Sequence, residues 1–275
     1  MLRHIMLWLA FESALGGCAR PSAIEHAQSL VRQHREDEAL ATLEERLRTH
    51  PDDQPARRLL VRVLASTGDM PRARTQVEEL AKRLPPGDPT PLLELGHALE
   101  LVHRYDDALD AYDRAAAVAP RSPAGPREGG MRCARWGEAD EAAPRLLEAV
   151  RRGARDAETW HTLGLVRVRL GDYDGAVEAY RAGAAADPRG AENWLGLATV
   201  AVARGDPTAA LAAYDEIVAR KPAFAAGQLG RAWALSQLGR KGDAQRAIDR
   251  AEELGAPPAA IAKQRAFVGA QPGKL

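Results

Sequence analysis

Residues 157–190 read AETWHTLGLVRVRLGDYDGAVEAYRAGAAADPRG, and their pattern gives the clearest indication of the fold. Apolar residues recur at helical spacing on both sides of Gly171, and Pro188 lies near the end. A glycine can end the first helix because it tolerates the left-handed conformation, and a proline stops the second because it cannot continue the hydrogen-bond ladder. The stretch therefore predicts two antiparallel helices joined by a short turn.

The same pattern recurs along the chain. A small residue near the start of the second helix marks each copy, at Ala39, Ala73, Ala108, Ala142, Ala176, Ala210 and Ala244, with intervals of 34 residues and one of 35. His34 and His103 replace the turn glycine in two copies, and Ala154 and Ala256 replace the final proline in two. With Asp88 as an insertion, the predicted repeats are 20–53, 54–87, 89–122, 123–156, 157–190, 191–224 and 225–258. One hairpin cannot bury its own apolar face, so the copies must stack.

This unit resembles the tetratricopeptide repeat (TPR), whose pattern runs W-x2-L-G-x2-Y, then A-x3-F, then P. The matching residues are Trp160, Leu163, Gly164, Ala176 and Pro188, while Arg167 stands in place of the first tyrosine and Tyr180 in place of the phenylalanine. The resemblance implies an all-α, right-handed superhelical solenoid of about seven hairpins with a concave face. Residues 259–275 are expected to form a capping helix and a frayed tail.

Repeat 123–156 departs most from the pattern. Gly129 and Gly130, with Pro126, fall in its first helix, and Pro144 falls in its second. Each interior glycine costs about 1 kcal/mol relative to alanine. If Asp140 is the N-cap, Pro144 lies at the edge of what a first turn tolerates. The repeat is therefore either a degenerate unit or a hinge between two blocks of three repeats.

The first residues suggest a second resemblance. Arg3 precedes an apolar stretch at 5–11, and Leu15-Gly16-Gly17-Cys18 follows. These residues resemble the lipobox of bacterial lipoproteins, in which the cysteine is acylated and the preceding peptide bond is cut. The resemblance implies a signal peptide at 1–17 and a lipid anchor with a short tether at 18–19.

The residues beside this motif bear on where the protein resides. Ala19 follows the cysteine, which by analogy favours the periplasmic face of the outer membrane over the inner membrane. Glu12 favours the alternative, because a carboxylate is unfavourable in an apolar signal segment. In that alternative the protein is cytosolic and Cys18 is an ordinary thiol.

Composition and motifs argue against several functions. Lys and Arg number 38, as do Asp and Glu, so the chain lacks the net positive charge typical of nucleic-acid binders. No phosphate-binding loop, catalytic motif or set of metal ligands appears. Cys133 falls at an inward position and reads as a small buried hydrophobe. We therefore expect no enzyme activity, no cofactor and no metal.

The TPR resemblance assigns the concave surface to fixed positions of each first helix. The middle repeats place Arg58, Arg62, His97, Arg127, Met131 and Arg135 at these positions. The last three repeats place His161, Leu165, Val168, Arg169, Leu195, Val202, Leu229 and Trp233 there. The first half is basic and the second is largely apolar, which predicts a groove that binds a protein or peptide segment. The capping helix or the chain ends could instead cover part of this face.

The two resemblances together predict a lipid-anchored, non-catalytic scaffold that assists assembly of an outer-membrane or envelope complex. The layout resembles the pilotin lipoproteins of type IV pili, which help a secretin subunit assemble. The alternative is a soluble cytosolic TPR adaptor or regulator. Adaptors that clamp chaperone tails are disfavoured, because the sole asparagine, Asn193, lies off the predicted groove.

Overall fold

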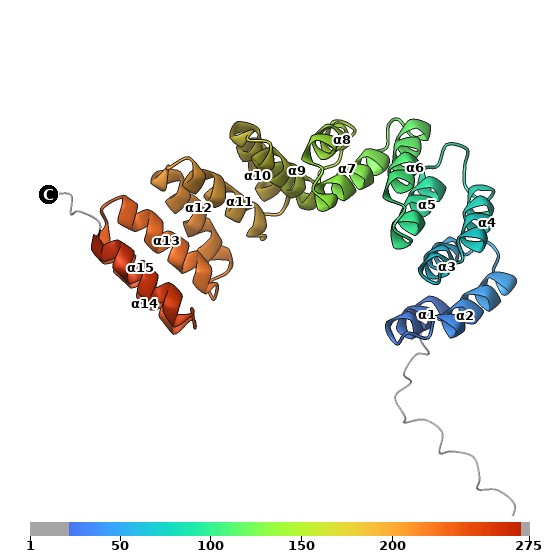
Figure 1. Cartoon of the computed structure of the whole chain (residues 1–275), viewed down its shortest axis with the longest axis horizontal. Coiled ribbons are helices and arrows are strands. Elements are labelled where there is room, and N and C mark those ends of the chain that lie inside the picture. The colour runs from blue at the N-terminus through green and yellow to red at the C-terminus, as the bar shows by residue number, and fades with distance from the viewer. Residues whose placement is uncertain (1–21, 271–275) are drawn as a thin grey trace, which may run out of the picture.

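The computed structural model describes residues 22–270, and these residues are helical with short connections. The helices are α1 (Ala23–Arg32), α2 (Glu36–Thr49), α3 (Gln54–Ser66), α4 (Met70–Ala81), α5 (Thr90–Leu101), α6 (Tyr105–Val118), α7 (Ala124–Trp136), α8 (Ala139–Arg151), α9 (Ala157–Arg169), α10 (Tyr173–Ala186), α11 (Glu192–Ala203), α12 (Pro207–Arg220), α13 (Ala225–Gln237), α14 (Lys241–Glu253) and α15 (Pro258–Ala270). They form an open arch of successive helical hairpins (Figure 1). The all-helical solenoid predicted from the sequence is confirmed.

The odd-numbered helices α1 to α13, here called the inner helices, lie on the concave side of the arch. The backbones of consecutive inner helices from α1 to α11 approach one another closely, whereas those of consecutive even-numbered helices, the outer helices α2 to α14, stay further apart. Elements that approach each other lie on the inside of a curve, and elements that spread apart lie on its outside. The same arrangement is visible in Figure 1, where α4, α6, α8 and α10 lie along the outer edge.

The turns within the hairpins use the left-handed backbone conformation. Gly68, Gly171 and their counterparts have positive φ, as predicted for glycines that end a helix. His34 and His103 replace glycine and adopt the same conformation, with φ of 56° and 59°. A non-glycine residue is strained there, so the surrounding hairpin must impose this geometry on the two histidines.

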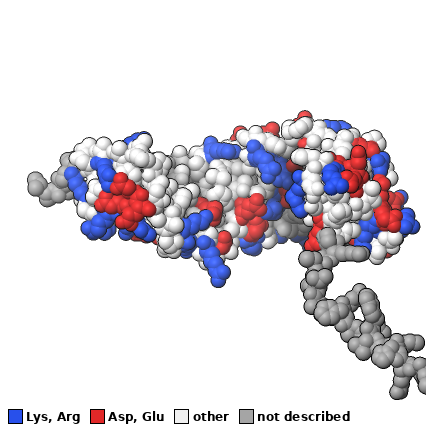
Figure 2. Space-filling view, turned by 90° about the horizontal axis from the view of Figure 1, so that it is seen from below, with Lys and Arg blue, Asp and Glu red and all other residues white. Residues whose placement is uncertain are grey.

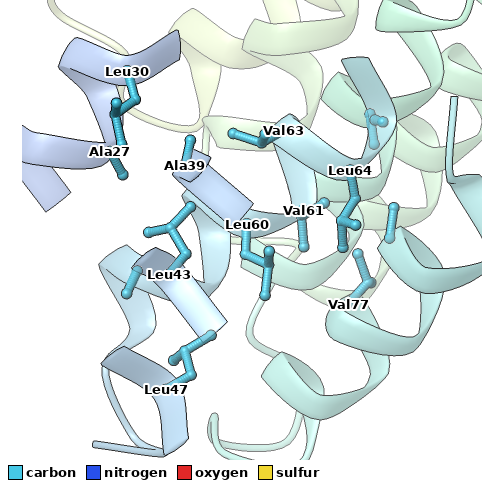
Figure 3. Packing of buried hydrophobic residues seen from close by; sticks show 14 residues of the cluster. Ala27, Leu30, Ala39, Leu43, Leu47, Leu60, Val61, Val63, Leu64 and Val77 are labelled. Atoms are coloured by element: carbon cyan, nitrogen blue, oxygen red, sulfur yellow. The ribbon is translucent and has the colours of Figure 1, made fainter. Parts of the chain in front are cut away.

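Leucine, valine and alanine side chains fill the space between hairpins. In the first two repeats, Leu30, Leu43, Leu60 and Leu64 are buried together where α1, α2, α3 and α4 meet (Figure 3). Ala39 lies among them with no exposed surface. A small residue at this point lets the helix axes approach closely, which is why the repeat keeps alanine there.

Tyrosine rings on the outer helices enter slots formed by glycine. Tyr180 of α10 is almost fully buried, and a Cβ built on Gly164 or on Gly196 would lie 2.5 or 2.4 Å from its ring. Tyr214 of α12 fills an equivalent slot against Gly230, at 2.2 Å from a Cβ built there. These glycines are required by close approach, because any side chain would collide with the ring.

Repeat 123–156 is built from two continuous helices. A Cβ on Gly130 would meet Leu146 at 2.8 Å, and one on Gly125 would meet the backbone of Ala116 at 2.4 Å, so these glycines permit close helix packing. The N-cap of α8 is Glu138 rather than the predicted Asp140, which places Pro144 further inside the helix. Whether this repeat acts as a hinge stays a prediction.

The last helix covers the end of the solenoid. Ile261 and Val268 of α15 are buried against a cluster that includes Leu235 and Ile248. This is the role predicted for a cap, which must shield the apolar face of the final hairpin. Among residues 22–270, no helix combines the length and the apolar character needed to cross a membrane. Cys18 and the proposed signal segment lie outside the described residues.

Candidate functional site on the concave face

The inner helices α3, α5 and α7 are linked by charged side chains. Glu94 of α5 is fully buried and accepts hydrogen bonds from two arginines of α3. Arg58 donates from Nε to Oε1 at 2.7 Å. Arg62 donates from Nε to Oε2 at 2.8 Å and from Nη2 to Oε1 at 2.9 Å, which is the bidentate geometry of a strong pair. One buried carboxylate thus joins two guanidinium groups across adjacent repeats.

His97 of α5 connects the ion pairs around Glu94 to Glu128 of α7. Its Nε2 lies 3.2 Å from Oε2 of Glu128, within hydrogen-bonding distance. Its Nδ1 lies 3.9 Å from Oε2 of Glu94, which is too long for a hydrogen bond and makes that interaction coulombic. The ring also packs edge-on against Tyr112 at 5.6 Å. The imidazole therefore lies between two carboxylates that belong to neighbouring repeats.

Arg132 completes this link from the α7 side. It donates from Nε to Oε1 of Glu100 at 2.6 Å and from Nη2 to Oε2 of Glu128 at 3.1 Å. The hydroxyl of Tyr112 donates to the same Glu100 oxygen at 2.5 Å. The carboxylates of this region are therefore each held by at least two partners.

The network shifts the titration of its members. Burial by itself raises the pKa of Glu94, but the nearby His97 ring and the hydrogen-bonded guanidinium groups of Arg62 and Arg58 outweigh it and lower the pKa to about 2. Burial by itself lowers the pKa of His97, but Glu128 and Glu94 outweigh it and raise the pKa. Burial, followed by the Glu100 carboxylate, raises the pKa of Tyr112. These directions favour an ionised Glu94 beside a protonated His97.

Arg127 extends the network from α7 to α9, since its Nη1 also donates to Oε1 of Glu128 at 3.1 Å. It donates from Nε to the Thr159 hydroxyl at 2.9 Å and from Nη2 to Oε2 of Glu158 at 2.7 Å. Its Nη2 also lies 3.2 Å from Oδ1 of Asp156, which caps α9. This arginine is thus occupied by acceptors of the following repeat.

A pocket of ≈470 Å³ opens where α5 ends, α6 begins and α7 ends. Its basic and polar lining consists of Arg62, His97, Glu100, Arg132 and Arg135, and its apolar lining consists of Leu101, Tyr105 and Trp136. The Tyr105 and Trp136 rings lie 4.9 Å apart between centroids. The pocket therefore places cations next to an aromatic wall.

The inner face of the later repeats has a different character. Leu165 of α9 and Leu195 of α11 expose 43% and 44% of their surface, and Val202 of α11 exposes 37%. Half-buried Trp233 packs against the buried cluster formed by Ala201, Ala210 and Ala234. Three apolar side chains on two adjacent inner helices are therefore left open.

Other predicted groove residues are partly used inside the chain. Met131 packs against the cluster around Cys133, and Leu229 packs against the cluster that contains α15. Arg169 donates from Nη1 to the carbonyl oxygen of Ala134 at 2.9 Å. His161 is half-buried beside the ring of Tyr180, and burial lowers its pKa.

In the first half of the predicted groove, several basic side chains are paired with carboxylates. Arg58, Arg62 and Arg127 are placed on the inner helices, but each has a carboxylate partner within residues 22–270. On the face seen from below, acidic and basic side chains lie next to one another in several groups (Figure 2). Mapping carboxylates as well as cations would have revealed Glu94 and Glu128, which occupy the same position of successive repeats.

Two residues outside the groove, Cys133 and Asn193, are buried. Cys133 is fully buried, and this burial raises the pKa of its thiol to about 11, so it is a packing residue as predicted. Asn193 is almost fully buried rather than presented to the concave face. Within residues 22–270, no group of histidine, cysteine and carboxylate side chains is arranged to hold a metal ion.

Comparison with known families agrees with this geometry. The tetratricopeptide repeat profile matches residues 24–89, 135–191 and 161–225, which together cover more than half of the chain. The chain belongs to the tetratricopeptide-repeat family. The architecture is that of a scaffold for protein binding, a family type that is generally not catalytic.

Individual relatives share parts of the chain. The heat-shock protein cognate co-chaperone sgt12 of Aspergillus fumigatus is 32% identical over 104 residues, 36% of this chain and 30% of that protein. The chain thus spans about a third of the length of this curated relative.

Solved structures share the fold. The C-terminal part of a TPR protein from Cytophaga hutchinsonii aligns over 87% of this chain and 98% of its own, at 14% identity and a TM-score of 0.65. YrrB, a TPR protein with an unusual peptide-binding site, aligns over 70% of this chain and 98% of its own, at 18% identity and a TM-score of 0.60. MamA aligns over 61% and 91%, at 20% identity and a TM-score of 0.57.

Proposed function

We propose that this protein binds a segment of another protein on its concave face, with the inner surface of α9 and α11 as the main contact. The observation that carries this proposal is the exposure of Leu165, Leu195 and Val202 on these adjacent inner helices. Isolated exposed leucines are ordinary, but apolar side chains grouped on a concave surface are typical of interaction sites. The peptide-binding site of YrrB, which has the same fold, supports a comparable use here.

The structure changes how the first half of the groove takes part. Arg58 and Arg62 are held by Glu94, so they shape a stable wall and are less available to an acidic partner. Arg135 lies on the same side and remains exposed. We therefore assign the apolar contact to the later repeats and restrict the electrostatic contact to the pocket near Arg135.

Affinity purification followed by mass spectrometry tests the proposal. The Leu165→Asp/Leu195→Asp double variant should lose the specific partners that the unaltered chain retains, because a charged group would face an apolar ligand surface. Leu147→Asp is the matched control, since Leu147 is equally exposed but lies on the outer helix α8. Far-UV circular dichroism should show that both variants fold. If all three proteins retain the same partners, the concave face is not the binding site.

We further propose that the scaffold is lipid-anchored through Cys18 and acts, like a pilotin, in the assembly of an envelope complex at the periplasmic face of the outer membrane. This proposal rests on Leu15-Gly16-Gly17-Cys18. Intact-mass measurement of protein extracted from membranes should show that residues 1–17 are absent and Cys18 is acylated. An unprocessed Met1 with a free Cys18 thiol would contradict the anchor.

The similarity to a co-chaperone favours a second candidate, a soluble cytosolic adaptor. The two candidates differ in the fate of the N-terminus, so the same mass measurement separates them. In either case the concave face carries the binding function, and the variants at Leu165 and Leu195 test it independently of location.

A further inference from the structure

The pocket between α5, α6 and α7 contains two arginines that are fixed in place. Arg62 uses Nε and Nη2 to bind Glu94, and Arg132 uses Nε and Nη2 to bind Glu100 and Glu128. No acceptor within residues 22–270 is hydrogen-bonded to Nη1 of either side chain. Each guanidinium group is therefore oriented while one of its amino groups stays available. A ligand that binds there would lose little additional side-chain entropy.

Arg135 adds a third cation that is not neutralised. It lines the same pocket, is exposed, and forms no ion pair with any residue between 22 and 270. Among the residues that line the pocket, three carry a guanidinium group (Arg62, Arg132 and Arg135) and one carries a carboxylate (Glu100), so cations exceed anions along its lining. A protonated His97 raises this excess. The local charge thus favours an anionic ligand although the whole chain is neutral.

The opposite wall of the pocket is apolar and also open. Leu101 exposes 46% of its surface and Tyr105 exposes 41%. The Tyr105 hydroxyl lies 2.8 Å from Nδ1 of His103, and its ring packs against Trp136, so its orientation is defined on both sides. Aromatic rings with a fixed orientation are common anchors in protein interfaces.

We propose that this pocket binds one acidic side chain together with an adjacent large apolar side chain of a partner polypeptide. The carboxylate would meet Arg135 and the available amino groups of Arg62 and Arg132, because the planar guanidinium group matches a carboxylate in shape and charge. The apolar side chain would cover Leu101, Tyr105 and Trp136. The volume of ≈470 Å³ suits side chains of this size. This inference rests on the proposed function and names the feature by which the partner is selected.

Selection from a random peptide library displayed on phage tests the proposal with the full-length chain as bait. The selected sequences should place Asp or Glu beside Leu, Phe or Trp. A synthetic peptide with the consensus sequence and blocked termini is the probe for calorimetry. Arg135→Glu should weaken its binding at least tenfold, and exchange of the peptide's acidic residue for its amide should have a similar effect. Combining the two changes should cost less than the sum, because both remove the same contact.

Two variants separate the pocket from general effects. Arg121→Glu is the matched control, since Arg121 is exposed on the α6–α7 connection and has no ion pair within the described residues, so it should leave the affinity unchanged. Trp136→Ala should weaken binding by a similar factor at high and low salt, whereas the effect of Arg135→Glu should shrink in high salt. Circular dichroism checks that each variant is folded.

Three results would overturn the proposal. The first is the absence of an acidic and apolar consensus, and the second is equal binding to Arg135→Glu and to the unaltered chain. The third is binding that appears only when the acidic residue is replaced by phosphoserine, which would indicate a phosphopeptide site. If Leu165→Asp/Leu195→Asp abolishes binding while Arg135→Glu does not, the pocket is wrong but the proposed groove survives.

Discussion

In the third and fourth repeats the inner helices carry glutamate at the sixth repeat position, whereas in the sixth and seventh repeats they carry glycine there. Glu94 binds two arginines of the neighbouring inner helix, and Glu128 binds a histidine of the neighbouring inner helix and an arginine of its own helix. Gly196 and Gly230 instead admit the rings of Tyr180 and Tyr214 from the preceding outer helices. A buried tyrosine, Tyr112, also fills a slot against Gly96 in the charged region, so the sixth position adds a charged link there to packing that both regions share.

This difference also separates the two kinds of concave surface. Where carboxylates join the hairpins, Arg58, Arg62 and Arg132 are held by these carboxylates and the surface is polar, with Arg135 left exposed beside them. Where tyrosine joins them from the outer side, the inner face has no polar network to support, and Leu165 and Leu195 remain exposed. The comparison teaches that a groove residue cannot be assigned to a ligand until its contacts inside the solenoid are known.

The largest effect is expected for Gly196→Ala. The new methyl group would lie about 2.4 Å from the buried ring of Tyr180, so the ring or the helices must shift. Overpacking of this kind costs about 1–3 kcal/mol, and urea denaturation should show a loss near the upper limit. Gly269→Ala is the control, because a Cβ there meets no atom within 4 Å, and this variant should be neutral or slightly stabilised. Equal stabilities of the two variants would show that the tyrosine slot does not join the hairpins.

A smaller loss, about 2 kcal/mol, is expected for Glu94→Gln, because a buried carboxylate that binds two guanidinium groups becomes a neutral amide. The matched change Glu141→Gln affects an exposed i, i+4 pair with Arg145 and should cost less than about 1 kcal/mol. The denaturation midpoints of the two variants measure the difference in their loss of stability. A comparable loss of stability at both sites would mean that the charged network stabilises the fold no more than a surface ion pair does.

The pH dependence of stability should reveal the contributions of His97 and Glu94. The folded pKa of His97 is raised, so its stabilising contribution is present at pH values below its ordinary range and is lost as the pH rises through the folded pKa. The folded pKa of Glu94 is lowered to about 2, so its contribution is present above its ordinary pKa and is lost as the pH falls towards 2. His97→Gln should therefore destabilise the chain by about 1 kcal/mol at pH 5.5 and by less at pH 9. A difference that grows towards pH 9 would contradict the raised pKa.

The smallest effect is expected for repeat 123–156, whose sequence predicts low stability. Gly129 and Gly130 suggested a degenerate unit or a hinge, but Gly130 packs against Leu146, and Arg132 and Arg127 connect α7 to both neighbouring inner helices. Native-state hydrogen exchange should therefore give the amides of α7 about the same protection as those of α11. Markedly faster exchange around Gly129 and Gly130 would support the hinge, because a weak unit uncouples its neighbours in a solenoid.

The sequence by itself determined the solenoid. Its repeated glycine, alanine and proline act through local backbone geometry and through contacts with the next copy, so a single period fixes helix lengths, turns and stacking. Even the left-handed His34 and His103 were marked by their place in the period. The burial of Cys133 followed from the same reasoning, since its inward position does not depend on distant residues.

Only the tertiary structure decided what the concave face presents. The partners of Arg62 and Arg127 come from the following repeat, about 30 residues away in the chain, and their pairing depends on side-chain geometry across two helices. The pocket beside Arg135 likewise needs the ends of α5 and α7 and the start of α6 to meet. A periodic pattern specifies which residues face inward. Whether an inward-facing residue remains available to a ligand depends on its side-chain contacts with neighbouring helices. Those contacts depend on distances between helices that the pattern does not contain.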